Sequence, residues 1–362
     1  MKQPCDCQRR SFLKGSGITL AGFGVMSLLP GALIEHAMAS TSATNGKRLI
    51  FIFLRGGNDG LNALIPHGDP DYNTVTRPTL YIAPADAINL NGFVSLHPAL
   101  QPLKAMYDSN DLAVMHRVGY ADSSHSHFDG QRIWENGDPS QPKLFEGWLY
   151  RYLRQQSGTE SAALPVLTAQ ATAPLLLRGD QSYLNIANPD EFDFLHMPPK
   201  RDKYSGAWGQ RYSNLHGLQR YRPMLSEVGL NLIDTLDLYR SWDQTNWNPL
   251  DPDTGYALFP VSDATNPDDP NGPGGKKFAT TSYEFFKSLK ICALAMLENA
   301  DTSVAGTQLG GWDLHDGQGS LAGDHATLLS WLGYGIRSLQ VALSGAAIDD
   351  RSYPSIWQDT VD

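Results

Sequence analysis

The sequence predicts an α/β domain with a central, mainly parallel sheet flanked by helices. Leu49–Leu54 is an unbroken apolar run rich in β-branched and aromatic residues, which is typical of a strand buried on both faces. A helix is expected to begin at Pro98 and to continue to Tyr107, and a second apolar run follows at Leu112–Val118. The order strand, helix, strand is that of a βαβ unit, in which the two strands are parallel.

The first 39 residues resemble an export leader. The pattern consists of a paired arginine, two apolar residues and, after a mildly apolar run, a small-x-small cleavage signal: Arg9, Arg10, Phe12, Leu13, Ala37 and Ala39. A membrane anchor is the alternative, but Gly, Ser and Pro30 dilute the apolar run. We therefore expect the twin-arginine translocase to export the folded chain to the periplasm or the extracellular space, without a stable membrane anchor after cleavage, and residues 40–46 to be a linker.

The composition of the remaining chain limits its partners, its disulfide bonds and its number of domains. Loss of the leader removes four cationic and two acidic side chains, which changes the formal charge from −10 to −12. An acidic protein is poorly suited to binding nucleic acid or an anionic membrane, and we expect neither partner. Cys292 alone then remains, so no internal disulfide can form. The chain is long enough for one large domain or two smaller ones, and we take 47–362 as a single α/β domain.

The other predicted elements follow in chain order. They are a short strand and loop at Tyr81–Ala99, helices at Phe128–Asn136 and Leu144–Gln155, strands at Leu164–Ala169 and Leu175–Leu177, a helix at Ser282–Asn299, a strand at Thr302–Leu309 and a helix at Asp324–Leu343. Residues 198–277 are expected to be a helical insertion followed by a mobile acidic loop. Calcium binding is the alternative for that loop, but the spacing of a calcium-binding loop is absent.

Side chains that could bind a metal ion or act in catalysis follow three of the predicted strands. Asp59 lies in the glycine-rich loop after the first strand, the Ser124–His127 segment follows the second, and Asp313 with His315 follows the strand at Thr302–Leu309. Because parallel strands place their carboxyl ends on one rim, we expect these groups to converge. Carboxylates and imidazoles bind divalent ions such as Zn²⁺, Mn²⁺ or Mg²⁺, so Asp59, Asp313 and His315 are candidate metal ligands.

Ser126 and His127 are the candidate catalytic residues. Ser126 stands just before the predicted helix at Phe128, where backbone N–H groups stabilise an anion. A serine there, beside a divalent cation, could be the nucleophile for a phosphate or sulfate ester. Structural alternatives remain open: Ser126 as an ordinary N-cap, the glycine-rich loop as a tight turn, and His127 as a solvated loop residue. Likewise, Asp313 could cap a turn while His315 bonds a carbonyl.

Five segments in this order carry a family resemblance: RRSFLKGSG, FLRGGNDGLN, LHPAL, SHSHFDGQRIWE and GGWDLHDGQ. They resemble the exported family catalogued as domain of unknown function 1501, which is similar to the alkaline phosphatase and sulfatase superfamily. The resemblance implies an alkaline-phosphatase-like fold, a two-metal site and hydrolysis of phosphate or sulfate esters. By position, it implies metal binding by Asp59, Asp313 and His315, and places Ser126 in the nucleophile region, with His127 beside it.

The resemblance also implies a shortened C-terminus. Family members continue through a further strand and through Glu-Phe-Gly-Arg and Asp-His-Gly segments that resemble the remaining metal ligands, whereas this sequence ends at Asp362. We therefore expect a sheet without that strand, weak metal binding and little or no turnover. The rival hypothesis is a non-catalytic periplasmic binding or assembly protein that contacts carbohydrate or protein. Its eight tryptophans and fifteen tyrosines suit sugar stacking, although core packing explains most aromatic residues.

Overall fold

The computed structural model describes residues 47–155, 164–180, 183–187, 235, 238–239, 241–242, 247–260 and 280–344. The expected leader at 1–39, the linker at 40–46 and most of the expected insertion at 198–277 lie outside these residues. The signal residues Arg9 and Arg10 are therefore among those without a structural description.

The centre of the domain is a four-stranded, all-parallel sheet with the order β1-β7-β5-β6. Its strands are β1 (Leu49–Leu54), β5 (Val166–Ala169), β6 (Leu184–Ile186) and β7 (Val304–Leu309). In β1 and β7 the register runs from Leu49 opposite Val304 to Leu54 opposite Leu309, so both strands end at the same level. The predicted α/β class with a mainly parallel sheet is confirmed.

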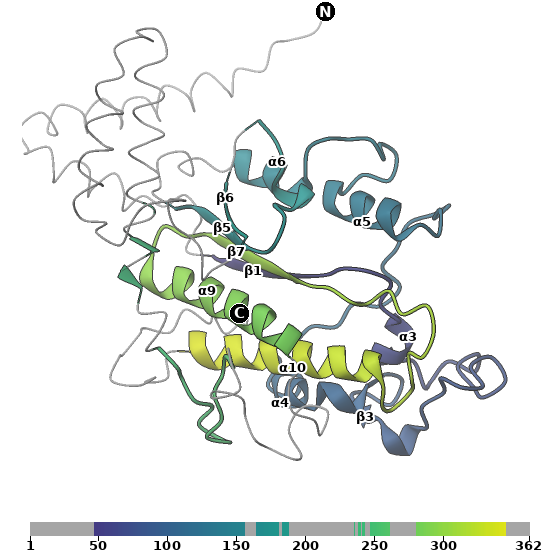
Figure 1. Cartoon of the computed structure of the whole chain (residues 1–362). Coiled ribbons are helices and arrows are strands. Elements are labelled where there is room, and N and C mark those ends of the chain that lie inside the picture. The colour runs from purple at the N-terminus through teal and green to yellow at the C-terminus, as the bar shows by residue number, and fades with distance from the viewer. Residues whose placement is uncertain are drawn as a thin grey trace, which may run out of the picture.

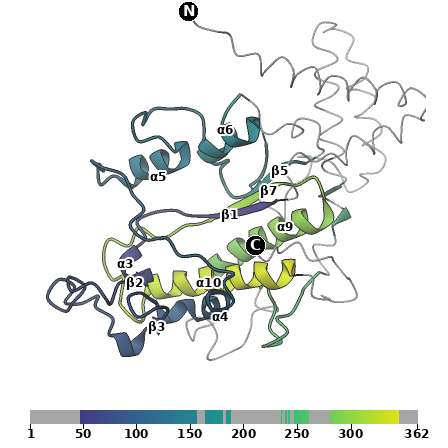
Figure 2. The same cartoon turned by 180° about the vertical axis from the view of Figure 1, so that it is seen from behind.

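Helices cover both faces of this sheet. On one face lie α9 (Thr280–Glu298) and α10 (Asp324–Leu343), and on the other lie α5 (His127–Asn136) and α6 (Trp148–Arg154) (Figures 1 and 2). The main core lies between the sheet and α9 and α10, where α9 buries an almost continuous apolar run. Cys292 lies in that run as a free thiol, and burial raises its pKa to about 12.

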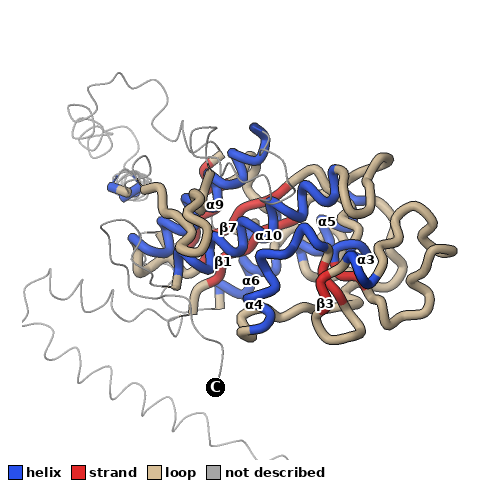
Figure 3. The backbone as a smooth tube through the Cα atoms, turned by 90° about the horizontal axis from the view of Figure 1, so that it is seen from below, coloured by secondary structure: helices blue, strands red, loops and turns tan. Residues whose placement is uncertain are grey.

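A smaller antiparallel sheet extends the domain beyond the carboxyl ends of the main strands. It consists of β2 (Leu64–Ile65), β3 (Ile88–Asn89) and β4 (Ser95–Leu96), in the order β2-β4-β3. The helix α3 (Gly60–Ala63) joins β1 to β2, and α3 and β3 lie at the same end of the molecule (Figure 3). The other short helices are the 3₁₀ segments η1 (Pro84–Asp86), η2 (Pro98–Leu103) and η3 (Leu175–Leu177), with α4 (Lys104–Asp108) directly after η2.

Two predicted strands are wrong. Leu112–Val118 is not a strand, because Met115 and Val118 are exposed and Arg117 adopts a positive φ of 57°, which no extended strand contains. Leu175–Leu177 follows a proline and forms the 3₁₀ helix η3. The neighbour of β1 is therefore β7, a strand from the C-terminal part of the chain, and the expected βαβ unit from β1 to Leu112–Val118 does not exist.

The burial of β1 also differs from the prediction. The strand has the predicted bounds, but its pattern is exposed at Leu49 and intermediate at the next five positions. The reason is its place at the end of the strand order. In the part of the chain that the structure describes, no helix is both long and apolar enough to cross a bilayer.

Candidate functional site

The loops that leave β1 and β7 meet backbone to backbone. The Arg55 N–H donates to the carbonyl of Leu309 at 2.9 Å, and the Trp312 N–H donates to the carbonyl of Arg55 at 3.3 Å. Gly56 has a φ of 126°, and a Cβ on it would lie 2.5 Å from the backbone nitrogen of Asp313. Only glycine permits both this conformation and this approach. Asp313 is thereby fixed beside the end of β1.

The N-terminus of α5 lies against the same loop. A Cβ on Gly57 would lie 2.3 Å from Cε1 of His127, the first residue of α5. Ser126 is the N-cap of α5, and its Oγ accepts from the Asp129 N–H at 3.4 Å. Ser126 is therefore the N-cap of α5, as the structural alternative predicted. This local role does not prevent its hydroxyl group from also acting on a ligand.

Asp313 connects two histidines. Its Oδ1 lies 2.9 Å from Nε2 of His127, and its Oδ2 lies 3.3 Å from Nε2 of His315. We call His127, Asp313 and His315 the His–Asp–His cluster. His127 and Asp313 are each 43% exposed and His315 is 85% exposed, so the cluster is open to solvent.

A partly buried ion pair holds α5 on the sheet. The guanidinium of Arg55 donates to Glu135 Oε1 at 3.0 Å, to Gln131 Oε1 at 3.0 Å and to the side chain of Gln308 on β7. Glu135 is only 5% exposed. Arg55 thus joins two strands to the helix that carries His127. Arg55 is not among the residues predicted from the sequence, although an arginine at the end of an apolar strand is an available signal.

Asp59 belongs to a different network. Its Oδ1 accepts from the Leu61 N–H at 3.1 Å as the N-cap of α3, and its Oδ2 accepts from Arg77 and, at 2.7 Å, from Nε2 of Gln318. The carboxylate is thus occupied by a cation and two neutral donors. Neither Arg77 nor Gln318 was expected to contact it.

A buried histidine supports the loop from behind. Nε2 of His325 donates to Oδ1 of Asn58 at 2.9 Å, and its ring packs edge to face against Trp312 and His97. Burial lowers the pKa of His325 to about 4, so the imidazole is neutral near pH 7. His325 is not among the residues predicted from the sequence, where its only signal is an Asp-His pair at the start of α10.

A hollow of about 800 Å³ opens between the end of β1 and α5. It is lined by glycines, hydroxyls, imidazoles and aromatic rings, among them Gly56, Asn58, Tyr120, Ser123, His125, Ser126, His127 and Trp134. Its volume falls in the range of small-molecule sites. Ser126 and His127 thus share one wall that a small ligand could reach.

The structure brings some of the candidate residues together. Ser126, His127, Asp313 and His315 gather where β1 and β7 end, whereas the carboxylate of Asp59 is turned to Arg77 and Gln318. Among the described residues, no group of three or more His, Cys, Asp or Glu side chains is arranged to hold a metal ion. A divalent ion shared by Asp59, Asp313 and His315 does not fit this arrangement, because the carboxylate of Asp59 is already paired with the guanidinium of Arg77.

No protein-family model, curated protein or solved structure matches the chain. The resemblance to domain of unknown function 1501 therefore stays a prediction.

Proposed function

We propose that this protein hydrolyses phosphate or sulfate monoesters, with Ser126 as the nucleophile and His127 as the residue that moves the proton. The observation that carries the proposal is the position of Ser126 at the N-terminus of the ten-residue helix α5, on the wall of the hollow and directly before His127. Free backbone N–H groups and the helix dipole favour a bound anion there. A phosphate or sulfate group is such an anion.

The reaction proceeds in two steps. First, Oγ of Ser126 bonds to phosphorus or sulfur while the bond to the leaving alcohol breaks, and the serine proton passes by way of His127 to the alcohol oxygen. Water then replaces the serine oxygen, which releases phosphate or sulfate and restores Ser126. The contact between His127 Nε2 and Asp313 Oδ1 supports this role, because a carboxylate orients the imidazole and stabilises its protonated form.

The family resemblance implies a divalent ion, which would be Zn²⁺, Mn²⁺ or Mg²⁺. This ion remains a proposal, and neither step of the reaction depends on it. Binding by Asp59 would require its carboxylate to leave Arg77. We therefore expect turnover of the present chain to be low.

Export is also part of the proposal. The paired Arg9 and Arg10 support delivery by the twin-arginine translocase to the periplasm or the extracellular space. Replacement of both residues by Lys should leave uncleaved precursor in the cytoplasm. Normal amounts of mature protein outside the cytoplasm would contradict this assignment.

A second candidate function is non-catalytic carbohydrate binding. It is favoured by Trp134, which is 49% exposed and lines the hollow together with Tyr120. Exposed aromatic rings stack on sugar faces. In this case His127 and Asp313 would bind hydroxyl groups, and Ser126 would remain an N-cap.

Turnover of para-nitrophenyl phosphate and para-nitrophenyl sulfate separates the two candidates. We expect the wild type to hydrolyse at least one ester slowly, Ser126→Ala to lose that activity, and Ser123→Ala to retain it. Ser123 lines the same hollow and is exposed, so it is a matched control. Equal rates in Ser126→Ala and the wild type would reject the hydrolase. Absence of turnover together with oligosaccharide binding that Trp134→Ala abolishes would support the second candidate.

A further inference from the structure

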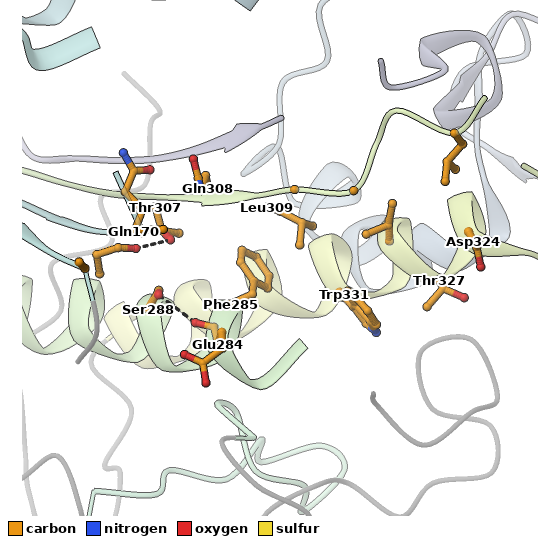
Figure 4. Close-up of a pocket in the computed structure, with 17 residues that line it drawn as sticks. Gln170, Glu284, Phe285, Ser288, Thr307, Gln308, Leu309, Asp324, Thr327 and Trp331 are labelled. Carbon is orange, nitrogen blue, oxygen red and sulfur yellow. Dashed lines mark hydrogen bonds between the residues drawn. The ribbon is translucent and has the colours of Figure 1, made fainter. Parts of the chain in front are cut away.

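A second cavity lies on the other side of the sheet from α5. It has a volume of about 610 Å³ and lies between the carboxyl ends of β5 and β7 above and the helices α9 and α10 below (Figure 4). None of Ser126, His127, Asp313 or Asp59 lines it. Its volume is that of a site for a small organic molecule.

The walls of this cavity are mainly apolar. Figure 4 shows Phe285 rising from α9 towards the strand, and Leu309 extending from β7 towards the helices. Leu328 and Trp331 of α10 complete the apolar lining. Gly310 and Gly311, directly after β7, contribute no side chains, which leaves the space open at the strand ends. An apolar or aromatic body fits such a lining.

Among the described residues, the charged groups of the lining have one sign. Glu284 in the second turn of α9 and Asp324 at the start of α10 line the cavity, and no Lys, Arg or His of the described part of the chain does so. Both acids are exposed, and Glu284 also pairs with Lys287 at 3.4 Å. Like charges repel, so a carboxylate or phosphate ligand is disfavoured here, whereas a cation is favoured.

One buried polar group of the lining lacks a partner. Gln170, directly after β5, is 5% exposed, and its Nε2 donates to the carbonyl of Thr172 at 3.0 Å. Its Oε1 has no hydrogen-bond partner among the described residues. A buried acceptor without a partner destabilises the free protein, and a donor group on a ligand can satisfy it.

We propose that this cavity binds a small aromatic or alkyl amine. The apolar body contacts Phe285, Leu309 and Trp331, and the amine N–H donates to Oε1 of Gln170. Glu284 lies at the same end of the cavity as Gln170 and favours the positive charge (Figure 4). The proposal is independent of ester hydrolysis, because the two sites lie on opposite faces of the sheet and share no lining residue. It identifies a site for a cationic ligand on the opposite face of the sheet from a candidate site for an anionic one.

Three indole compounds of similar size test the proposal: tryptamine, tryptophol and indoleacetate, which carry a cation, a hydroxyl and an anion. Binding is measured by saturation-transfer NMR on the full chain. We expect tryptamine to bind most tightly, tryptophol more weakly and indoleacetate not at all. Tighter or equal binding of indoleacetate would overturn the proposal, and so would the failure of all three to bind.

Substitutions in the lining test whether tryptamine binds in this cavity. Gln170→Leu removes the unpartnered Oε1 at a similar volume, together with the Nε2 donor to the carbonyl of Thr172, an exposed residue whose carbonyl water can satisfy. The fold should therefore be retained and the affinity for tryptamine should fall about tenfold. Gln101→Leu, at an exposed position outside the cavity, should leave the affinity unchanged. Ala171→Trp adds a bulky ring at an exposed lining position and should abolish binding. Unchanged affinity in both Gln170→Leu and Ala171→Trp would overturn the assignment, whatever the ester assay shows.

Discussion

Nε2 of His127 lies 2.9 Å from Oδ1 of Asp313, and this contact joins the first residue of α5 to the loop after β7. The two residues are far apart in the sequence. They meet because β1 and β7 are register-paired neighbours, and because Gly56 lets the loop after β1 approach the Asp313 backbone. The predictions that follow test this contact and its supports.

The first prediction concerns Gly57. A Cβ at this position would lie 2.3 Å from the His127 ring, so Gly57→Ala should displace the imidazole from Asp313. We expect any ester turnover to fall at least about tenfold, since a displacement of about 1 Å in a catalytic group can cost much more. Gly60→Ala is the control, because Gly60 directly follows the same loop as the first residue of α3 and has open space around its Cβ position. Equal activity in both variants would show that the position of His127 is unimportant.

The second prediction concerns the ion pair between Arg55 and Glu135. Arg55→Met leaves a carboxylate that is 5% exposed without its cation, and we expect the free energy of unfolding to fall by about 3 kcal/mol in urea denaturation. Lys104→Met breaks the more exposed pair with Asp108 and should cost at most about 0.5 kcal/mol. A loss as small in Arg55→Met as in Lys104→Met would mean that the pair does not hold α5 on the sheet.

The third prediction concerns pH and His325. Its folded-state pKa of about 4 lies below the ordinary value of 6.5, mainly because of burial, with Asp59 opposing and His97 and Arg77 reinforcing the shift. The unfolded chain therefore binds a proton that the folded chain does not. The contribution of His325 to the free energy of unfolding should be fully present above about pH 6.5. It should decrease by about 2–3 kcal/mol as the pH falls towards 4.

Urea unfolding at several pH values measures this dependence. The His325→Gln variant lacks the titrating group, so the decrease between about pH 6.5 and pH 4 should become smaller, even if the variant is less stable at neutral pH. Burial also lowers the pKa of His97, which leaves a residual dependence of the same sign. An identical pH dependence in the variant would contradict the assignment to His325.

The fourth prediction concerns metal binding. Because Arg77 and Gln318 occupy the carboxylate of Asp59, protein incubated with Zn²⁺, Mn²⁺ or Mg²⁺ and then desalted should retain less than about one ion per chain. Arg77→Met frees the carboxylate and should increase retention, as measured by elemental analysis. Asp59→Asn in the same background should reverse the increase. Retention of about two ions by the wild type would show that the ion pair is replaced when metal binds.

Much of the architecture could be predicted from the sequence. Leu49–Leu54 and Asp324–Leu343 have the predicted bounds, since a long apolar run and a long amphipathic repeat are strong signals. Leu112–Val118 shows the limit of the same rule. Its composition matches that of a strand, but no strand of the described part of the chain pairs with it. Pairing is a tertiary property that periodicity does not reveal.

The candidate site was predictable only in part. The positions of Ser126, Asp313 and His315 follow from strand ends and a helix start, which are local features. The partners of Asp59 are not local, because Arg77 comes from a loop and Gln318 from the segment before α10. The role of His325 could not be predicted either, since its hydrogen bond with Asn58 joins two segments that are distant in the sequence. Local pattern therefore identifies reactive groups, whereas their partners depend on the packing of loops.

The central claim is that Ser126 is the nucleophile, and the most direct test is mass spectrometry of the protein quenched during incubation with para-nitrophenyl phosphate or para-nitrophenyl sulfate. The account predicts a phosphoryl or sulfuryl group on the peptide that contains Ser126, and its absence from the Ser126→Ala variant. Ester turnover that continues in Ser126→Ala, with no modified peptide in the wild type, would contradict the account.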